Sequence, residues 1–390
     1  MVAKTDRAPR FGSTWRRLPA TCPGDMPAGI AEAGVAMDRI TRITEDRHRP
    51  GQTPVVALSH NEINILPDFL SHYRTLCYAS FLIVDDRSTD GSREYLAAQP
   101  DVTLFEPVPG AEFGKERAIW KSGLLDHYGA GQWCLSPDVD ELFVCPGPVS
   151  RGLAGYIAAL EAEGAEAAIA LMIDMYGDLA LADHVHKADD GLSLTQRFDH
   201  FDGPAPFPGG YTMRPVTKKQ LETHPAPPVR FNGGARDRLF FLQDAQPTAL
   251  QSRMIERFLR LDRTVTPRGL DAVLRRLARN RTRHLFQGAL NATKIGLFKW
   301  QPGTVFNGHV MDRPVRLSES IAALLHFPLT RGRAGIEYIV QRGQHAGGSR
   351  YYKALLDGGG LDRSPVFEHS RRYEGPQSLT GLIRDVPGGR

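Results

Sequence analysis

Two short apolar runs that end in acids limit most strongly what this chain can fold into. The first, Phe81–Asp86, reads F-L-I-V-D-D, and the second, Trp133–Cys145, reads W-C-L-S-P-D-V-D-E-L-F-V-C. Such runs are typical of strands buried on both faces, as in a parallel sheet. Because ligands bind at the carboxyl ends of parallel strands, both groups of acids are expected at a binding site.

Predicted strands and helices alternate along the first half of the chain. This β-α-β-α order predicts an α/β fold with a mainly parallel central sheet flanked by helices. The predicted strands are the segment that starts at Thr53, Phe81–Val84, Val102–Phe105, the D-x-D run and Ala167–Ile173, and the predicted helices are Ile65–Leu76, Ser92–Ala98, Lys115–Tyr128 and Gly155–Glu163.

Three regions are expected along the chain. Residues 1–52 are rich in Pro, Gly, Arg and Ala and predict a loosely ordered leader, with one short helix around Ile30–Ile43. Residues 53–345 form the folded domain, and residues 346–390 form a C-terminal extension that we expect to be poorly ordered beyond about Asp357. Within the domain, residues 183–230 are dense in Pro and Gly, which predicts long loops of the kind that form lids or binding loops.

Residues 246–285 predict a basic helical insertion. Within Gln251–His284 there are ten Arg and three acids, a net charge of 10 − 3 = +7 against +4 for the whole chain. Three uses remain open: a solvated helical face, peripheral contact of 251–285 with anionic lipid, or recognition of an acidic glycan. Apolar positions between the arginines are Leu259, Leu270, Leu274, Leu277 and Leu285.

Composition is that of an ordinary globular protein, with 41% hydrophobic and 24% charged residues in 390. The net charge of +4 is too small to indicate a nucleic-acid binder. No apolar stretch approaches the ~18–20 residues of a membrane span, and Arg16-Arg17 precedes no apolar signal segment. The four cysteines lack zinc-site spacing or disulfide density. These features predict a cytoplasmic protein, and contact of the basic insertion with the inner face of a membrane is one of the uses left open above.

The Asp138-Val139-Asp140-Glu141 segment has enough carboxylate oxygens to bind a hard divalent cation. If the strand continues through it, Asp138 and Asp140 point to the same side, because side-chain direction alternates along a strand. We therefore predict Asp140 as a direct metal ligand, and Asp138 as a ligand through water or a contact to ribose. Glu141 would face the other way. The alternative is a solvated acidic loop.

Several segments together resemble a known family. V-V-A-L-S-H-N-E at 55–62, F-L-I-V-D-D-R-S-T-D-G-S at 81–92 and D-V-D-E at 138–141 resemble the opening half of a family 2 type glycosyltransferase with the GT-A fold. F-N-G-G-A-R-D-R-L-F at 231–240, T-K-I-G-L-F-K-W at 293–300 and L-L-H-F at 324–327 resemble motifs of its bacterial DxD-bearing subgroup. The resemblance extends from about residue 53 to 344 and is patchy between 183 and 230.

The resemblance implies a metal-dependent glycosyltransferase. The donor is a nucleoside-diphosphate sugar, with a UDP-sugar favoured, the cofactor is Mn²⁺ or Mg²⁺, and the anomeric centre is inverted. The acceptor is a glycan or lipid-linked glycan in bacterial surface-polysaccharide biosynthesis. Two other classes remain open: a sugar nucleotidyltransferase, and a non-catalytic glycan- or nucleotide-binding protein on the same fold. The first usually has a Gly-rich loop directly after the first strand, where this chain has Ser59-His60-Asn61-Glu62.

The resemblance also assigns residues to the nucleotide. Glu62 and Asp86, with Asn61 and Asp85 beside them, are expected to bind the base, since carboxylates accept hydrogen bonds from its N–H groups. The alternative is that Asp86 only caps the following turn.

The resemblance also implies basic side chains at the pyrophosphate and a late histidine at the metal. Lys115, Arg117 and Arg236 are the candidates for phosphate contact, since a guanidinium matches phosphate geometry; surface charge is the alternative. For the third metal ligand the resemblance implies His326, with His309 as the alternative ligand. His326 could instead be a buried histidine of the core with no ligand role.

A catalytic base must take the proton of the acceptor hydroxyl, and a positioned carboxylate suffices. Asp174 and Asp178 are the candidates because they follow the predicted strand Ala167–Ile173. Either residue could instead be a loop acid that accepts hydrogen bonds from backbone, and the sequence does not rank the two.

Overall fold

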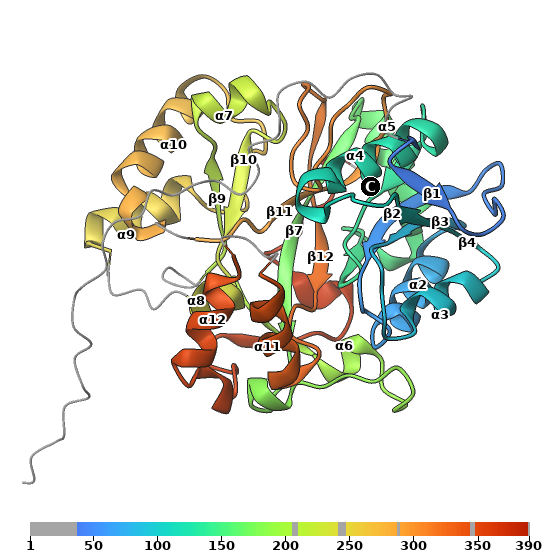
Figure 1. Cartoon of the computed structure of the whole chain (residues 1–390). Helices are drawn as coiled ribbons and strands as arrows, with labels where there is room; N and C mark the ends of the chain where they lie inside the picture. Colours follow the sequence, from blue (N-terminus) through green and yellow to red (C-terminus); the bar gives the residue numbers. More distant parts are fainter. Residues whose placement is uncertain (1–36, 205–209, 241–246, 287–288, 344–347, 389–390) are drawn as a thin grey trace, which may run out of the picture.

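The fold is taken from a computed structural model, which describes residues 37–204, 210–240, 247–286, 289–343 and 348–388 (Figure 1). Most of the predicted leader, including Cys22 and residues 30–36 of its predicted helix, lies outside the described residues.

A mixed, mostly parallel sheet forms the centre of the molecule, in the order β1-β4-β3-β2-β5-β11-β7-β12-β6. The strands that share one direction are β2 (Thr53–Ser59), β3 (Ala79–Asp85), β4 (Val102–Pro107), β5 (Trp133–Leu135), β7 (Ala167–Tyr176) and β12 (Leu317–His326). The strands that run against them are β1 (Ile40–Arg42), β11 (Thr293–Lys299) and β6 (Glu141–Val144). The predicted α/β class with a mainly parallel sheet flanked by helices is thus confirmed.

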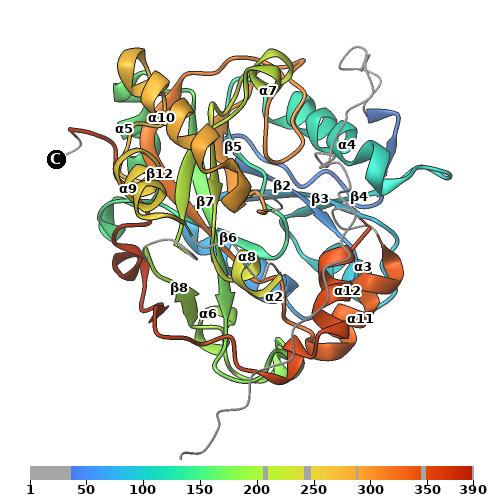
Figure 2. The ribbon, with the colours of Figure 1, turned by 90° about the vertical axis from the view of Figure 1, so that its left-hand side faces the viewer.

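Helices cover both faces of the sheet because buried side chains alternate along the strands. Val55 and Ala57 of β2 pack in one core cluster, whereas Val56 packs in a second cluster on the other face. The first cluster also holds the apolar sides of α2 (Leu66–Leu76), α3 (Ser92–Ala98) and α5 (Gly152–Glu163), and the second that of α4 (Phe113–Tyr128). Figures 1 and 2 show α4 on the opposite side of the strands from α2 and α3.

Short elements replace much of the predicted loop region 183–230. They are η2 (Leu181–Asp183), α6 (Leu194–Arg197), β8 (His200–Asp202), β9 (Thr212–Pro215), α7 (Lys218–Thr223) and β10 (Val229–Asn232). β9 and β10 form a separate antiparallel pair. The predicted basic helical insertion is helical: α9 (Ala249–Phe258), α10 (Gly269–Arg281) and η3 (Arg283–Phe286) follow, and α10 packs on β9.

Two predictions about the flanks are wrong. Ile40–Arg42 is not helical but forms β1, which pairs antiparallel with β4 through Ile40 and Pro107. Residues 358–388 are ordered: β13 (Ser370–Arg372) pairs with β8, and Leu379 and Leu382 are buried in the main core. Both strands are only three residues long, so pairing partners distant in the chain, not local periodicity, determine them.

The remaining elements complete the fold around the site. They are η1 (Val149–Arg151), α8 (Ala235–Phe240), α11 (Gly332–Arg342), α12 (Arg350–Asp357), η4 (Gly360–Asp362) and η5 (Pro376–Leu379). Among the described residues, none of the helices has the length and apolar character needed to cross a membrane.

Candidate functional site

The predicted site residues gather at one edge of the sheet. The carboxyl ends of β2, β3, β5, β7 and β12 lie at this edge, because these strands share one direction. The antiparallel strands β6 and β11 begin there, and Glu141 at the start of β6 is paired with His326 at the end of β12. The topology therefore brings the D-x-D segment and L-L-H-F together, although they are far apart in the sequence.

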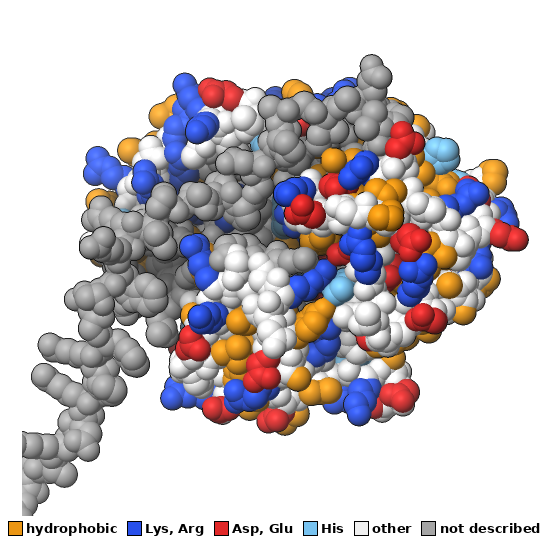
Figure 3. Space-filling model, in the orientation of Figure 1, with side chains coloured by type: hydrophobic (Ala, Val, Ile, Leu, Met, Phe, Trp, Pro, Cys, Tyr) orange, Lys and Arg blue, Asp and Glu red, His pale blue; other side chains and the backbone are white. Residues whose placement is uncertain are grey.

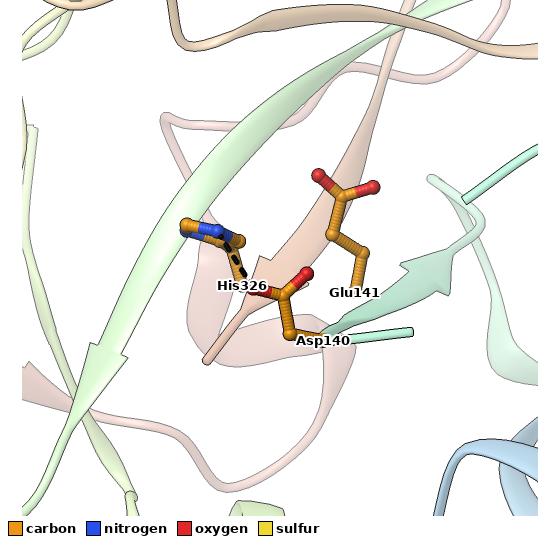
Figure 4. A group of neighbouring side chains, drawn as sticks. All are labelled: Asp140, Glu141 and His326. Atoms are coloured by element: carbon orange, nitrogen blue, oxygen red, sulfur yellow. Dashed lines mark ion pairs between the residues drawn. The ribbon is translucent and has the colours of Figure 1, made fainter. Parts of the chain in front are cut away.

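The D-x-D strand does not continue through its acids. Val139 and Asp140 form a turn between β5 and β6, so the rule of alternation does not apply to them. As a result Glu141 does not face away from Asp140, as we expected from the sequence. Instead, ligand atoms of Asp140, Glu141 and His326 all lie within 4.8 Å of one another (Figure 4).

This group fits a divalent cation. It offers two carboxylates and one imidazole, a donor set that suits Mn²⁺ or Mg²⁺. Glu141 is fully buried, and its Oε1 has no hydrogen-bond partner among the described residues. A buried carboxylate oxygen without a partner is costly, and a bound cation would satisfy it.

His326 is oriented by a second carboxylate, as is usual for a metal-binding histidine. Its Nδ1 lies 2.7 Å from Asp174 Oδ1, and its Nε2 lies 3.3 Å from Asp140 Oδ2. Burial and Arg236 would lower the pKa of His326, but Asp140 and Asp174 raise it to about 9. Without a metal the imidazolium therefore bridges the two carboxylates, and a cation at Nε2 would replace its proton.

Asp174 is engaged on both oxygens, which does not support its predicted role as the base. Oδ1 accepts from Arg236 Nε at 2.7 Å as well as from His326, and Oδ2 accepts from the Arg236 backbone N–H at 3.0 Å. Burial would raise the pKa of Asp174, but Arg236 and His326 lower it. Arg236 is thus occupied as the partner of Asp174. The other candidate, Asp178, is exposed after β7, where its charge acts on His184 and Arg372.

Two buried lysines neutralise the first acid of the D-x-D segment. Asp138 accepts from Lys121 Nζ at 3.0 Å and from Lys294 Nζ at 2.5 Å, and Lys294 also donates to Glu141 Oε2 at 2.7 Å. Partial burial would raise the pKa of Asp138, whose side chain is half exposed, but the two ammonium groups hold it well below its ordinary value. Glu141, rather than Asp138, stands beside Asp140 and His326 in the candidate metal group.

His309 lies outside this metal group. Its Nδ1 is 2.8 Å from the Thr293 carbonyl oxygen, which fixes the neutral tautomer that donates from Nδ1. Burial and the neighbouring Lys294 lower the pKa of His309 to about 3. Of the two predicted histidines, His326 is the one that the structure brings to the acids.

Three of the residues expected at the base contact arginines at the two ends of α11. Asp86 pairs with Arg342 at 3.0 Å, and the Asn61 carbonyl oxygen accepts from Arg331 at 2.7 Å. Glu62 lies 3.8 Å from Arg331, and burial raises the pKa of Glu62 to about 8.

Asp85 and the two predicted phosphate contacts on α4 differ in their surroundings. Asp85 is buried and accepts from the Ser88 backbone N–H at 3.0 Å, but its Oδ1 has no partner in the described chain. On α4, Lys115 is exposed and paired with Glu112, whereas Arg117 is partly buried and its charge lowers the pKa of His309. Of these two candidates, Arg117 is therefore the one whose charge acts on His309, the histidine beside Lys294.

The sequence prediction did not single out Lys121, Lys294, Arg331 or Arg342 as site residues. Lys121 follows Arg117 by one helical turn, and Lys294 stands within the T-K-I-G motif, so both had a usable signal. Arg331 and Arg342 stand at the two ends of α11, which carries no motif of its own.

Comparison with known proteins gives no family or relative. The chain matches no protein-family model, and a search of curated proteins found no match.

Proposed function

We propose that this protein is a metal-dependent glycosyltransferase that uses a nucleoside-diphosphate sugar, with a UDP-sugar favoured. The observation that carries the proposal is the group of Asp140, Glu141 and His326 at the carboxyl edge of the sheet, in which Glu141 has one buried oxygen, Oε1, without a hydrogen-bond partner among the described residues. The motif resemblance supplies the reaction class: transfer with inversion to a glycan or lipid-linked acceptor, in bacterial surface-polysaccharide assembly on the cytoplasmic side.

In this proposal the acidic residues and His326 bind the metal, and the basic residues neutralise the acids or contact the diphosphate. Asp140, Glu141 and His326 hold Mn²⁺ or Mg²⁺, which when bound supplies positive charge that stabilises a leaving diphosphate. Asp174 and Arg236 fix the ring of His326, and Lys121 and Lys294 balance the acids. Arg117 offers a guanidinium to the diphosphate.

On the same proposal, Asn61, Glu62, Asp85 and Asp86 bind the base. Arg342 pairs with Asp86, and Arg331 lies 3.8 Å from Glu62, so a base that binds there replaces these contacts with its own N–H groups.

A thermal-stability panel tests the proposal. The protein is heated with nucleoside diphosphates and their sugars, first with Mn²⁺ and then with a chelator. A ligand at about a hundred times its dissociation constant stabilises a fold by roughly 2.7 kcal/mol, enough to raise the melting temperature measurably. We expect one nucleotide to give a rise that the chelator abolishes, and Asp140→Asn to lack it.

Asp178→Asn is the matched control, because it removes one exposed carboxylate without touching the metal group. It should respond to metal and nucleotide like the unmodified protein. A rise that survives the chelator would favour a non-catalytic nucleotide-binding protein, and release of pyrophosphate from a nucleoside triphosphate and a sugar phosphate would favour a nucleotidyltransferase.

A further inference from the structure

Helix α10 exposes an apolar stripe that the other described residues leave open to solvent. Leu270, Val273 and Leu277 lie at spacings of three and four residues, hence on one face, and are 73%, 57% and 44% exposed. On the neighbouring helix α9, Leu250 is a further exposed apolar residue, at 65%. Large exposed apolar residues scattered singly are ordinary, but a row of them along one helix indicates a contact surface.

The stripe is held rigidly because the opposite face of α10 is anchored. Arg275 is fully buried there and donates to the Thr264 carbonyl oxygen at 2.6 Å. Ala278 packs in a small core with Ile255 of α9 and with Leu259, which directly follows that helix. Helix α10 therefore cannot turn its apolar stripe inward without breaking these contacts.

Arginines without acidic partners surround the stripe. Arg276, Arg281 and Arg283 beside it, and Arg253 and Arg257 on α9, are exposed and form no ion pair within the described parts of the chain. In Figure 3 Lys and Arg side chains lie among hydrophobic ones at the upper left, the region of α10 in Figure 1. Figure 2 shows both helices on the side that faces the viewer.

A surface with a row of exposed apolar side chains and arginines without ion-pair partners beside it matches one environment in particular. At the surface of a bilayer with anionic lipids, apolar side chains enter the acyl boundary while arginines contact phosphate head groups. An apolar partner helix would cover the leucines but leave five arginines without counter-charge, and a nucleic acid would neutralise the arginines but leave the leucines exposed.

We propose that α9 and α10 form a docking surface for membranes that contain anionic phospholipid. The helix pair lies on the membrane and does not span it. The proposal does not depend on the transferase activity, since none of the residues of the docking surface belongs to the candidate metal group.

Vesicle co-sedimentation tests this proposal with the full-length protein. Vesicles of phosphatidylcholine alone are compared with vesicles of phosphatidylcholine and phosphatidylglycerol, at low and high salt. We expect binding only to the anionic vesicles and weakening by salt. Leu270→Ser/Val273→Ser/Leu277→Ser should weaken binding at least tenfold. Arg276→Gln/Arg281→Gln/Arg283→Gln should weaken it roughly 100-fold, which corresponds to about 1 kcal/mol of binding free energy for each of the three arginines.

The matched control is Val149→Ser/Leu179→Ser/Val366→Ser, which removes three exposed apolar side chains elsewhere and should bind like the unmodified protein. Deuterium uptake of α9 and α10 in the unmodified protein, with and without vesicles, gives a second readout that needs no variant. The proposal is overturned if anionic vesicles neither bind nor protect these helices, or if the leucine triple variant binds unchanged. It is also overturned if the stripe mediates a dimer in solution or binds RNA instead of vesicles. The Mn²⁺ and nucleotide response of the variants reports separately on the proposed activity.

Discussion

Lys294→Met gives the sharpest test of how the acids of the site are balanced. Lys294 is 2% exposed and lies 2.7 Å from Glu141, which is fully buried, and 2.5 Å from Asp138, which is half exposed. Methionine keeps most of the side-chain volume but removes the ammonium group. The cost then comes mainly from Glu141, because solvent screens the carboxylate of Asp138.

Two routes give the same magnitude. Removing one partner of a buried ion pair destabilises a protein by about 3–5 kcal/mol. Alternatively Glu141, whose pKa burial already raises, takes up a proton. At pH 7 this costs at most roughly 3.7 kcal/mol, about 1.4 kcal/mol for each pH unit above the ordinary glutamate pKa of about 4.3. We therefore expect Lys294→Met to lose about 3–4 kcal/mol of unfolding free energy in urea titrations at pH 7 with a chelator present.

Lys299→Met is the matched control on the same strand. Lys299 is 45% exposed and lies 3.5 Å from Glu161, itself 51% exposed, so its loss should cost less than about 1 kcal/mol. Glu141→Gln added to Lys294→Met should recover most of the loss, because it removes the unpaired charge. Equal losses for the two lysine variants, or a loss below about 1 kcal/mol for Lys294→Met, would refute the reasoning.

Two further predictions concern pH and packing. Because the pKa of His309 is about 3 in the folded protein and about 6.5 when unfolded, the unfolded state binds more protons between these values, and stability is lost as the pH falls below about 6.5. His309→Gln removes this titrating group, so urea titrations from pH 7 to pH 5 should show a smaller fall in unfolding free energy than in the unmodified protein. An equal fall in the two proteins would contradict the prediction. Gly296→Ala should cost about 1–3 kcal/mol, since the added Cβ would lie 2.7 Å from Ala170 Cβ and 2.8 Å from Phe143 Cε2. Gly114→Ala, in helix α4 with nothing near its added Cβ, should instead be neutral or stabilising by melting temperature; equal effects of the two substitutions would refute the packing argument.

The order of strands and helices could be predicted because each element carries its own local pattern. Alternating apolar runs and helical periodicity were enough for the parallel sheet from Thr53 onward and for the basic helices. The short strands β1 and β13 could not be predicted, since each is defined by a partner more than sixty residues away. Propensity says little about strands of three residues.

The candidate site divides in the same way. Asp140 and His326 were predicted from motifs, and the structure brings them to 3.3 Å. The orientation of Glu141 was predicted wrongly because a turn at Val139-Asp140 interrupts the strand. The ion pair of Lys294 with Asp138 joins residues 156 positions apart, and no local pattern reports such a contact.

Direct detection of the metal tests the central claim most simply. Pulsed electron paramagnetic resonance of Mn²⁺ bound to the protein reveals whether an imidazole nitrogen coordinates the ion. The account predicts one tight Mn²⁺ site with such a nitrogen, whose coupling disappears in His326→Gln and persists in His309→Gln. Weak Mn²⁺ binding without nitrogen coupling, or coupling that His326→Gln leaves intact, would contradict it.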